Sequence, residues 1–180
     1  VLFDLDGTLL DSVPDLALAT DQMLQALGRP AAGEELVRSW VGNGAAMLVK
    51  RAVTGLQEPL DAELDAELDH ALFDQALPLF LDCYGKCCAS KSQLYEGVME
   101  FLQYLQAGAV TMGLITNKPI GFTEPLLELF QLQQYFSIVL GGDSLELKKP
   151  DPLPLNHAMQ KLLVTPAQTL MVGDSRSDIH

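Results

Sequence analysis

Four short apolar runs, each ending abruptly in small or polar residues, constrain the fold of this chain more than any other feature of its sequence. The runs are Val1–Phe3 before Asp4, Val110–Ile115 before Thr116, Ile138–Leu140 before Gly141, and Leu170–Val172 before Gly173. Apolar runs without alternation are typical of strands that are covered on both faces, as in a parallel sheet. Helical patterns lie between the runs, so that strand and helix alternate along the chain. The sequence therefore predicts an α/β fold with a doubly wound, Rossmann-like parallel sheet.

Three stretches between the later runs carry helix signals. Apolar residues recur about every 3.6 positions over 98–105, and Gly108 follows as a stop signal. A second helix is predicted to begin at Thr123, with Pro125 in its first turn. A third helix is predicted over about residues 155–163. These helices supply the connections that parallel strands need.

The stretch from residue 13 to residue 90 differs, because it contains helical patterns and no run that resembles a strand. Its first pattern places apolar residues of 16–27 on one helix face, and Gly28 can end that helix. We therefore predict a helical cap domain over 13–90, inserted into an α/β core formed by 1–12 and 91–180.

A second helical pattern of the insertion repeats leucine at every fourth position from Leu64 to Leu72, behind a possible cap at Asp61. This stretch carries five acidic residues, which spread around the helix and so indicate a solvated face rather than a cation site. They are Asp61, Glu63, Asp65, Glu67 and Asp69. Farther along, Cys83, Cys87 and Cys88 lack a second group that would complete a zinc site, and we expect reduced thiols on a helix.

Composition excludes several classes of partner. The chain has 24 acidic and 11 basic residues, which gives a net charge of −13. Nucleic acid and anionic membranes both attract basic patches, so neither is an expected partner. No apolar run approaches the roughly 20 residues that span a bilayer, and no phosphate-binding glycine loop is present. We expect a soluble, cytoplasmic protein.

Polar side chains gather where the predicted strands end. In open α/β sheets, ligands bind beyond the carboxyl ends of the strands. The residues placed there are Asp4, Asp6, Thr116, Asn117, Lys149 and Asp174. Clustered carboxylates repel one another unless a cation lies among them, and oxygen ligands suit Mg²⁺. The sequence therefore predicts a magnesium site at this edge of the sheet.

Four ordered motifs give the chain a family resemblance that covers almost its whole length. Asp4–Leu9, Ile115–Asn117, Lys149–Pro150 and Gly173–Asp178 resemble the motifs of the haloacid dehalogenase-like hydrolase superfamily. Within that superfamily the chain is most similar to the phosphoglycolate phosphatases. That narrower likeness rests on Phe3–Ser12, Trp40–Ala45, Thr116–Pro119 and Gly141–Ser144.

The resemblance implies roles for the three acids of the first and last motifs. Asp4 would be the nucleophile that forms an aspartyl-phosphate, and Asp6 would be the general acid–base. Mg²⁺ would be held by Asp4, by Asp174 and by a main-chain oxygen of Asp6.

The resemblance also implies a phosphate-binding set formed by Thr116, the Asn117 amide and Lys149. Lys148 directly precedes Lys149, so which amine reaches the phosphate is ambiguous, and the family pattern favours Lys149. Asp178 would lie beside the metal or orient Lys149.

The implied function is a magnesium-dependent phosphatase for a small phosphorylated metabolite, with 2-phosphoglycolate as the expected substrate. A sugar phosphomutase and a phosphatase for another small metabolite are the alternatives, and Asp6 argues against dehalogenase chemistry. The cap would exclude water from the site, with Asn43, Lys50 and Arg51 as candidate substrate contacts, although solvated surface is favoured for the last two. The chain starts without methionine and lacks the last strand and helix usual in the fold, so we expect it to be part of a longer protein.

Overall fold

The computed structural model describes residues 1–56 and 66–178 of the 180-residue chain. Contacts within the chain divide it into two compact units. The first unit joins Val1–Asp11 to the chain from Gln93 onward, and the second is Ser12–Ser92. No helix among the described residues is both long and apolar enough to cross a bilayer.

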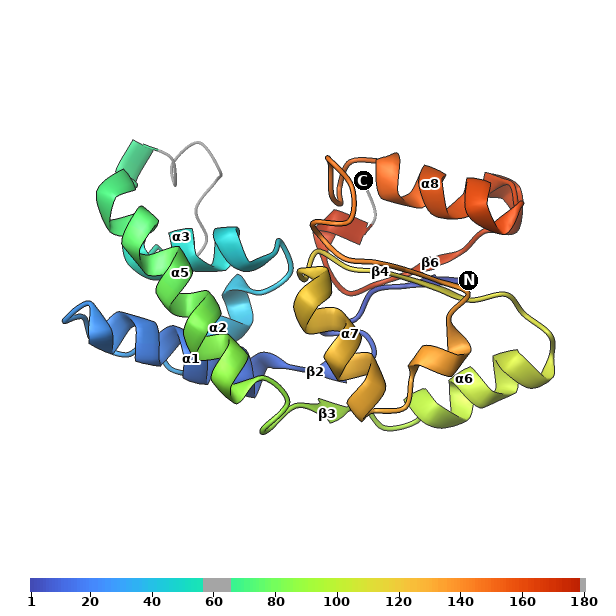
Figure 1. Cartoon of the computed structure of the whole chain (residues 1–180), viewed down its shortest axis with the longest axis horizontal. Coiled ribbons are helices and arrows are strands. Elements are labelled where there is room, and N and C mark those ends of the chain that lie inside the picture. The colour runs from blue at the N-terminus through green and yellow to red at the C-terminus, as the bar shows by residue number, and fades with distance from the viewer. Residues whose placement is uncertain (57–65, 179–180) are drawn as a thin grey trace. The chain divides into compact units, whose positions relative to one another are not determined.

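The first unit is built on a four-stranded parallel sheet (Figure 1). Its strands are β1 (Leu2–Phe3), β4 (Gly113–Ile115), β5 (Ile138–Leu140) and β6 (Met171–Val172), in the order β5-β4-β1-β6. Each strand lies within one of the four predicted apolar runs. The predicted α/β fold with a parallel sheet is therefore confirmed, and the carboxyl ends of all four strands meet at one edge.

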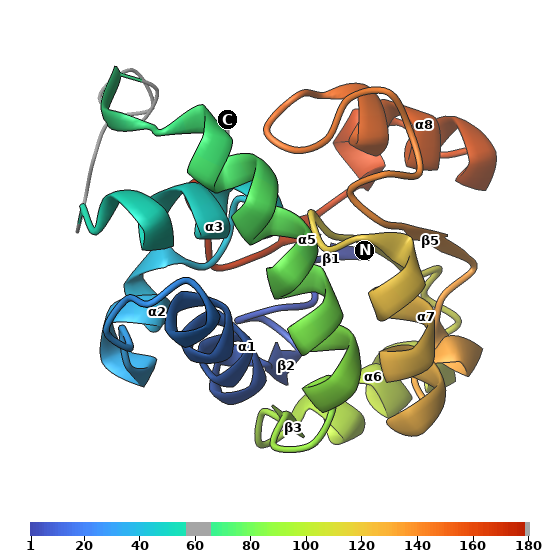
Figure 2. The ribbon, with the colours of Figure 1, turned by 60° about the vertical axis from the view of Figure 1, so that its left-hand side comes forward.

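Helices cover both faces of this sheet, which explains why its strands are apolar without alternation. The helices are α6 (Val98–Ala107), α7 (Ile120–Leu129) and α8 (Leu153–Leu162). Leu2 packs in one cluster with Ala158 of α8, whereas the ring of Phe3 meets that of Phe101 of α6 edge-on at 6.2 Å between centroids. Figures 1 and 2 both show α8 on the opposite side of the sheet from α6.

Helix α7 begins three residues earlier than predicted. The Ile120 N–H donates to Asp143 Oδ1 at 2.7 Å, so an acid from the loop after β5 satisfies the first turn. Thr123, the predicted first residue, lies inside the helix and donates from Oγ1 to the Pro119 carbonyl at 3.0 Å. The prediction was wrong because a hydroxyl that caps a helix and one that bonds back to the preceding turn give the same sequence signal.

The first unit also contains a short antiparallel pair that the sequence did not predict. Strand β2 (Leu10–Asp11) pairs with β3 (Gln93–Leu94), with Leu10 opposite Leu94. Neither strand lies in an apolar run of three or more residues, so the sequence carries no strand signal at either place. The pair brings together the two segments that lie directly before and directly after the second unit in the sequence.

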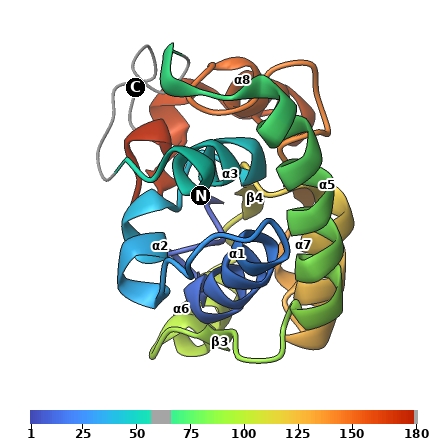
Figure 3. The ribbon, with the colours of Figure 1, turned by 90° about the vertical axis from the view of Figure 1, so that its left-hand side faces the viewer.

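The second unit is helical in its described residues, which contain no strand (Figure 3). Its helices are α1 (Val13–Ala26), α2 (Glu34–Trp40), α3 (Ala45–Thr54) and α5 (His70–Cys87), and α5 packs against α1 and α3. Helix α1 stops just before Gly28, as predicted, and that glycine has a φ of +70°.

Helix α5 differs from the predicted pattern of leucines. Its cap is Asp69, whose side chain accepts from the Leu72 N–H at 3.2 Å, and Leu68 lies before the helix. The prediction of a single helix that contains both Leu68 and Leu72 was therefore wrong. The predicted cap Asp61 lies outside the described residues, as do Glu63, Leu64 and Asp65. All three cysteines are free thiols, two on α5 and one at its end, as predicted.

Candidate active site

Asp4 lies at the carboxyl end of β1, in the middle of the sheet edge. Its main-chain N–H donates to the Val172 carbonyl at 2.9 Å, which continues the ladder between β1 and β6. The residue is only 4% exposed. Burial raises the pKa of its carboxyl to about 6, against the opposing effect of the nearby Lys149 ammonium. The carboxylate is therefore held in a place where its charge costs free energy unless a cation compensates it.

The chain turns sharply after Asp6, and Gly7 makes this turn possible. Gly7 has a φ of +83°, and a Cβ atom at this position would overlap the carboxylate of Asp174. Thr8 donates from Oγ1 to Asp174 Oδ1 at 3.0 Å. The first motif thus packs directly against the acid that follows β6.

Lys149 is buried in the site, with 2% exposure, whereas Lys148 is exposed. Its Nζ donates to Asp178 Oδ1 at 2.6 Å and lies 3.0 Å from Asp4 Oδ1. Asp178 is fixed in turn by Ser175, whose N–H and hydroxyl donate to Oδ2 at 3.0 and 2.7 Å. Of the two adjacent amines, the one on Lys149 therefore reaches the acids at the sheet edge, and Asp178 orients it.

Thr116 and Asn117 follow β4 and are both buried. The Thr116 N–H continues the pairing with β5 by donating to the Leu140 carbonyl at 2.9 Å. The side-chain amide of Asn117 donates to the main-chain carbonyl of Lys149 at 2.9 Å. This side chain therefore holds the Lys149 segment in place, and the contact of Thr116 and Asn117 with a phosphate stays a prediction.

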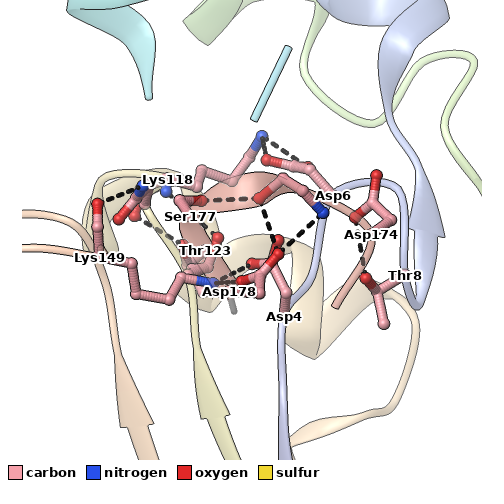
Figure 4. A network of polar contacts seen from close by, with 12 residues as sticks. Asp4, Asp6, Thr8, Lys118, Thr123, Lys149, Asp174, Ser177 and Asp178 are labelled. Atoms are coloured by element: carbon pink, nitrogen blue, oxygen red, sulfur yellow. Dashed lines mark hydrogen bonds and ion pairs between the residues drawn. The ribbon is translucent and has the colours of Figure 1, made fainter. Parts of the chain in front are cut away.

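Lys118 is a site residue to which the sequence assigned no role. Its Nζ lies 3.0 Å from both carboxylate oxygens of Asp6, and its side chain is 3% exposed (Figure 4). The available signal was its position: it directly follows Thr116 and Asn117 at the end of a strand. A lysine there points to the same edge as the acids.

Three carboxylates could hold a metal ion. Asp4, Asp174 and Asp178 each offer an oxygen, and these atoms lie within 4.8 Å of one another. Asp4 Oδ1 is buried, and the ammonium of Lys149 lies 3.0 Å from it. Loss of contact with water also raises the pKa of Asp174, although the Thr8 hydroxyl opposes this. An oxygen-only set of mutually repelling acids, of which Asp4 and Asp178 are buried, fits a hard cation such as Mg²⁺.

The carboxylate cluster contains two of the three predicted metal residues and one further acid. Asp4 and Asp174 belong to the carboxylate cluster, and Asp178 supplies its third member. The side chain of Asp6 is paired with Lys118, and a metal contact by the main-chain oxygen of Asp6 stays a prediction.

In the helical unit, two of the three predicted substrate contacts, Arg51 and Lys50, have neighbours within the unit. Arg51 donates from Nη1 to the Trp40 carbonyl at 2.5 Å. Lys50 places its Nζ 6.0 Å from the centroid of the Phe73 ring, at the limit of a cation–π contact. Arg51 therefore has a structural role, and substrate contacts by Asn43 and Lys50 stay predictions.

Comparison with known proteins places these features in context. The model of the family described as haloacid dehalogenase-like hydrolase matches residues 1–180. A phosphoglycolate phosphatase of Pseudomonas putida KT2440 is 52% identical over 180 residues, covering 100% of this chain and 64% of the relative. A phosphoglycolate phosphatase of Psychrobacter arcticus is 46% identical over 179 residues, covering 99% of this chain and 76% of the relative.

A solved structure shares the fold over nearly the whole chain. The crystal structure of a predicted phosphoglycolate phosphatase from Haemophilus somnus 129PT has a TM-score of 0.87 and 39% identity, and the match covers 99% of this chain and 77% of that one. The chain thus spans less than two thirds of the Pseudomonas putida relative, and a larger share of the other two proteins.

Proposed function

Because this chain belongs to the haloacid dehalogenase-like hydrolase family, we propose that it is a magnesium-dependent phosphatase that hydrolyses 2-phosphoglycolate to glycolate. The observation that carries the proposal is the meeting of Asp4, Asp174 and Asp178 with Lys149 at the edge of the sheet. The substrate is suggested by the names of the relatives, which are about half identical to this chain.

In the first step, an oxygen of Asp4 forms a bond to phosphorus while the bond from phosphorus to the ester oxygen breaks. Asp6 gives its proton to the departing oxygen, so the alcohol leaves neutral. The product on the enzyme is an aspartyl-phosphate at Asp4. Mg²⁺, held by Asp4, Asp174 and a main-chain oxygen of Asp6 beside Asp178, would offset the repulsion between a carboxylate and a phosphate dianion.

In the second step, Asp6 takes a proton from water as the water oxygen bonds to phosphorus. The bond between phosphorus and Asp4 breaks, which restores the Asp4 carboxylate and releases inorganic phosphate. Asp6 is protonated again, so the cycle consumes one ester and one water and leaves the enzyme unchanged. The same carboxyl group must therefore face the reacting oxygen in both steps.

Lys149 and Thr116 would stabilise the charge that spreads over the phosphoryl oxygens in the transition state. The short bond from Lys149 to Asp178 fixes the ammonium before substrate arrives, so little reorganisation is needed. We include the helical unit Ser12–Ser92 in the proposal as a cap that keeps bulk water from the aspartyl-phosphate.

The proposal is tested with a panel of phosphate esters that includes 2-phosphoglycolate and several hexose phosphates, assayed with Mg²⁺ for released phosphate. We expect 2-phosphoglycolate to have the highest kcat/KM, and both EDTA and Asp4→Asn to abolish turnover. Conversion of a hexose phosphate into its isomer without phosphate release would instead identify a phosphomutase. Activity that survives in Asp4→Asn would remove the nucleophile from the mechanism.

A further inference from the structure

We propose that Lys118 is a positioning residue, which holds the carboxyl group of Asp6 in the orientation needed for proton transfer. This inference rests on the proposed phosphatase function, because only that function gives Asp6 a proton to transfer. Lys118 Nζ lies 3.0 Å from each oxygen of Asp6. The Lys118 side chain is 3% exposed and that of Asp6 is 14% exposed, so one group is buried and the other opens toward solvent.

The amine of Lys118 reaches Asp6 from a separate strand, as Figure 4 shows. Asp6 follows β1, whereas Lys118 follows β4, the neighbouring strand in the sheet. The contact therefore ties the turn of the first motif to the loop of the second motif. An ammonium that bonds both oxygens of one carboxylate restricts rotation of that carboxylate, which a single hydrogen bond does not.

The main chain of Lys118 is itself clamped by the loop that follows β5. The Lys118 carbonyl accepts from the Gly142 N–H at 2.8 Å, and a Cβ atom at Gly142 would overlap the Asn117 carbonyl. On the other side, the Lys118 N–H donates to Thr116 Oγ1 at 3.2 Å. Close approach of the two loops therefore fixes the start of the lysine side chain, and burial fixes the remainder. The entropy cost of ordering this lysine side chain is therefore met on folding rather than during catalysis.

The chemistry explains why such a clamp matters. Asp6 delivers a proton to the ester oxygen in the first step and removes one from water in the second step. An error of about 1 Å in such a group costs on the order of 100-fold in rate. Asp6 lies directly before the turn at Gly7 and its side chain is partly open to solvent, so burial restricts its carboxylate less than it restricts Lys118.

The test compares wild-type protein with Lys118→Met, using 2-phosphoglycolate and p-nitrophenyl phosphate at saturating Mg²⁺. The alkoxide of the first substrate needs a proton in order to leave, whereas nitrophenolate does not. We expect kcat/KM of Lys118→Met to fall 10- to 100-fold for 2-phosphoglycolate and less than 3-fold for p-nitrophenyl phosphate. Because the second step still needs Asp6, the aryl ester should show a burst of nitrophenolate followed by a slow steady state. Lys118→Arg should recover part of the loss.

A double-mutant cycle with Asp6→Asn separates positioning from a general structural role. We expect Lys118→Met to have no further effect once Asp6 is asparagine, since the group that it positions is already inactive. Lys161→Met, at an exposed lysine of α8, removes the same charge and should behave as wild type.

Three results would overturn the inference. Equal losses of kcat/KM on both esters would indicate a structural defect, and a raised KM for 2-phosphoglycolate at unchanged kcat would make Lys118 a substrate ligand. Full additivity with Asp6→Asn would likewise exclude positioning. Wild-type protein that hydrolyses neither ester would instead overturn the proposed function, and the inference with it.

Discussion

At the scale of single residues, the buried carboxyl group of Asp4 lowers the stability of the fold at neutral pH, although the proposed mechanism requires it in the ionised form. Its pKa is raised by burial from 3.8 to about 6, so the folded protein binds this proton more tightly than the unfolded chain does. Stability contributed by this group is therefore present at low pH and is lost as the pH rises from about 4 to about 6. At pH 7 the ionised group costs about 1–3 kcal/mol, at 1.36 kcal/mol per pKa unit.

Asp4→Asn should therefore stabilise the metal-free protein while it abolishes turnover. We expect the free energy of unfolding in EDTA at pH 7 to rise by about 1–3 kcal/mol, and the difference to vanish near pH 4. Denaturant titrations at both pH values measure this effect. Added Mg²⁺ should stabilise the wild type and have little effect on the variant. An Asp4→Asn protein that is less stable than wild type at pH 7 without metal would contradict the account.

Gly7 is a second residue of the site, where the backbone conformation and the space available both require glycine. Gly7→Ala would place a methyl group both at a φ of +83° and inside the space of the Asp174 carboxylate. We expect the displaced Asp174 to lower Mg²⁺ affinity at least 10-fold, measured by calorimetry, and to lower stability by about 1–3 kcal/mol through backbone strain. Gly28→Ala is the matched control, since Gly28 has a similar φ of +70° and no neighbour within 4 Å of a Cβ atom. It should reproduce the loss of stability with unchanged metal affinity, and weaker Mg²⁺ binding in this control would refute the role of close approach.

The sequence was sufficient to predict which residues reach the sheet edge, but not how they pair. Asp4, Thr116 and Asp174 each follow an apolar run, and parallel strands bring such positions together whatever the connections between them. The bond from Lys118 to Asp6 joins residues 112 positions apart and depends on the path of a long side chain, which no spacing encodes. The sequence also could not show which of Lys148 and Lys149 is buried, because the two residues are identical and adjacent.

At the scale of elements, the local sequence pattern decided what could be predicted. Helices α6 and α8 and the four parallel strands lie in stretches with a helical pattern or an apolar run, and their bounds fall within a few residues of the predicted ones. Strands β2 and β3 are fixed by pairing with each other rather than by local pattern, so only the folded chain reveals them. The start of α7 likewise depends on Asp143, which is 23 residues away.

Asp15 shows how an element can be held by one buried acid. It lies in the first turn of α1 with no exposed surface, and its carboxylate accepts from the hydroxyls of Ser90 and Ser92 at 2.7 and 2.6 Å. It also accepts from the N–H groups of Lys91 and Ser92, both at 2.9 Å. The carboxylate thus fastens the start of α1 to the segment that follows α5.

Asp15→Ala should therefore be strongly destabilising, because it leaves several buried donors without an acceptor. We expect a loss of about 3 kcal/mol or more in the free energy of unfolding, measured with urea. Asp82→Ala, which removes an exposed acid paired with Lys86 on α5, is the control and should change stability little. Comparable losses in the two variants would mean that the buried network adds nothing beyond a surface ion pair.

At the scale of the whole molecule, the net charge of −13 affects how the proposed anionic substrate would approach. Close to the site the charges nearly balance, because four carboxylates (Asp4, Asp6, Asp174 and Asp178) face two ammonium groups (Lys118 and Lys149) and a proposed divalent cation. The long-range field is then that of the remaining surface, which is negative and repels a phosphate ester.

Salt should consequently accelerate capture of substrate by this protein. The Debye length falls from about 30 Å at 0.01 M to about 8 Å at 0.15 M ionic strength, so screening removes repulsion beyond the site itself. We expect kcat/KM for 2-phosphoglycolate to rise several-fold as the ionic strength is raised from about 0.01 M to about 0.15 M at constant free Mg²⁺. The value of kcat should change little, because it describes the complex in which substrate is already bound. A fall in kcat/KM with salt would instead show that the cations of the site dominate the field at long range, and that the acidic surface has no part in substrate approach.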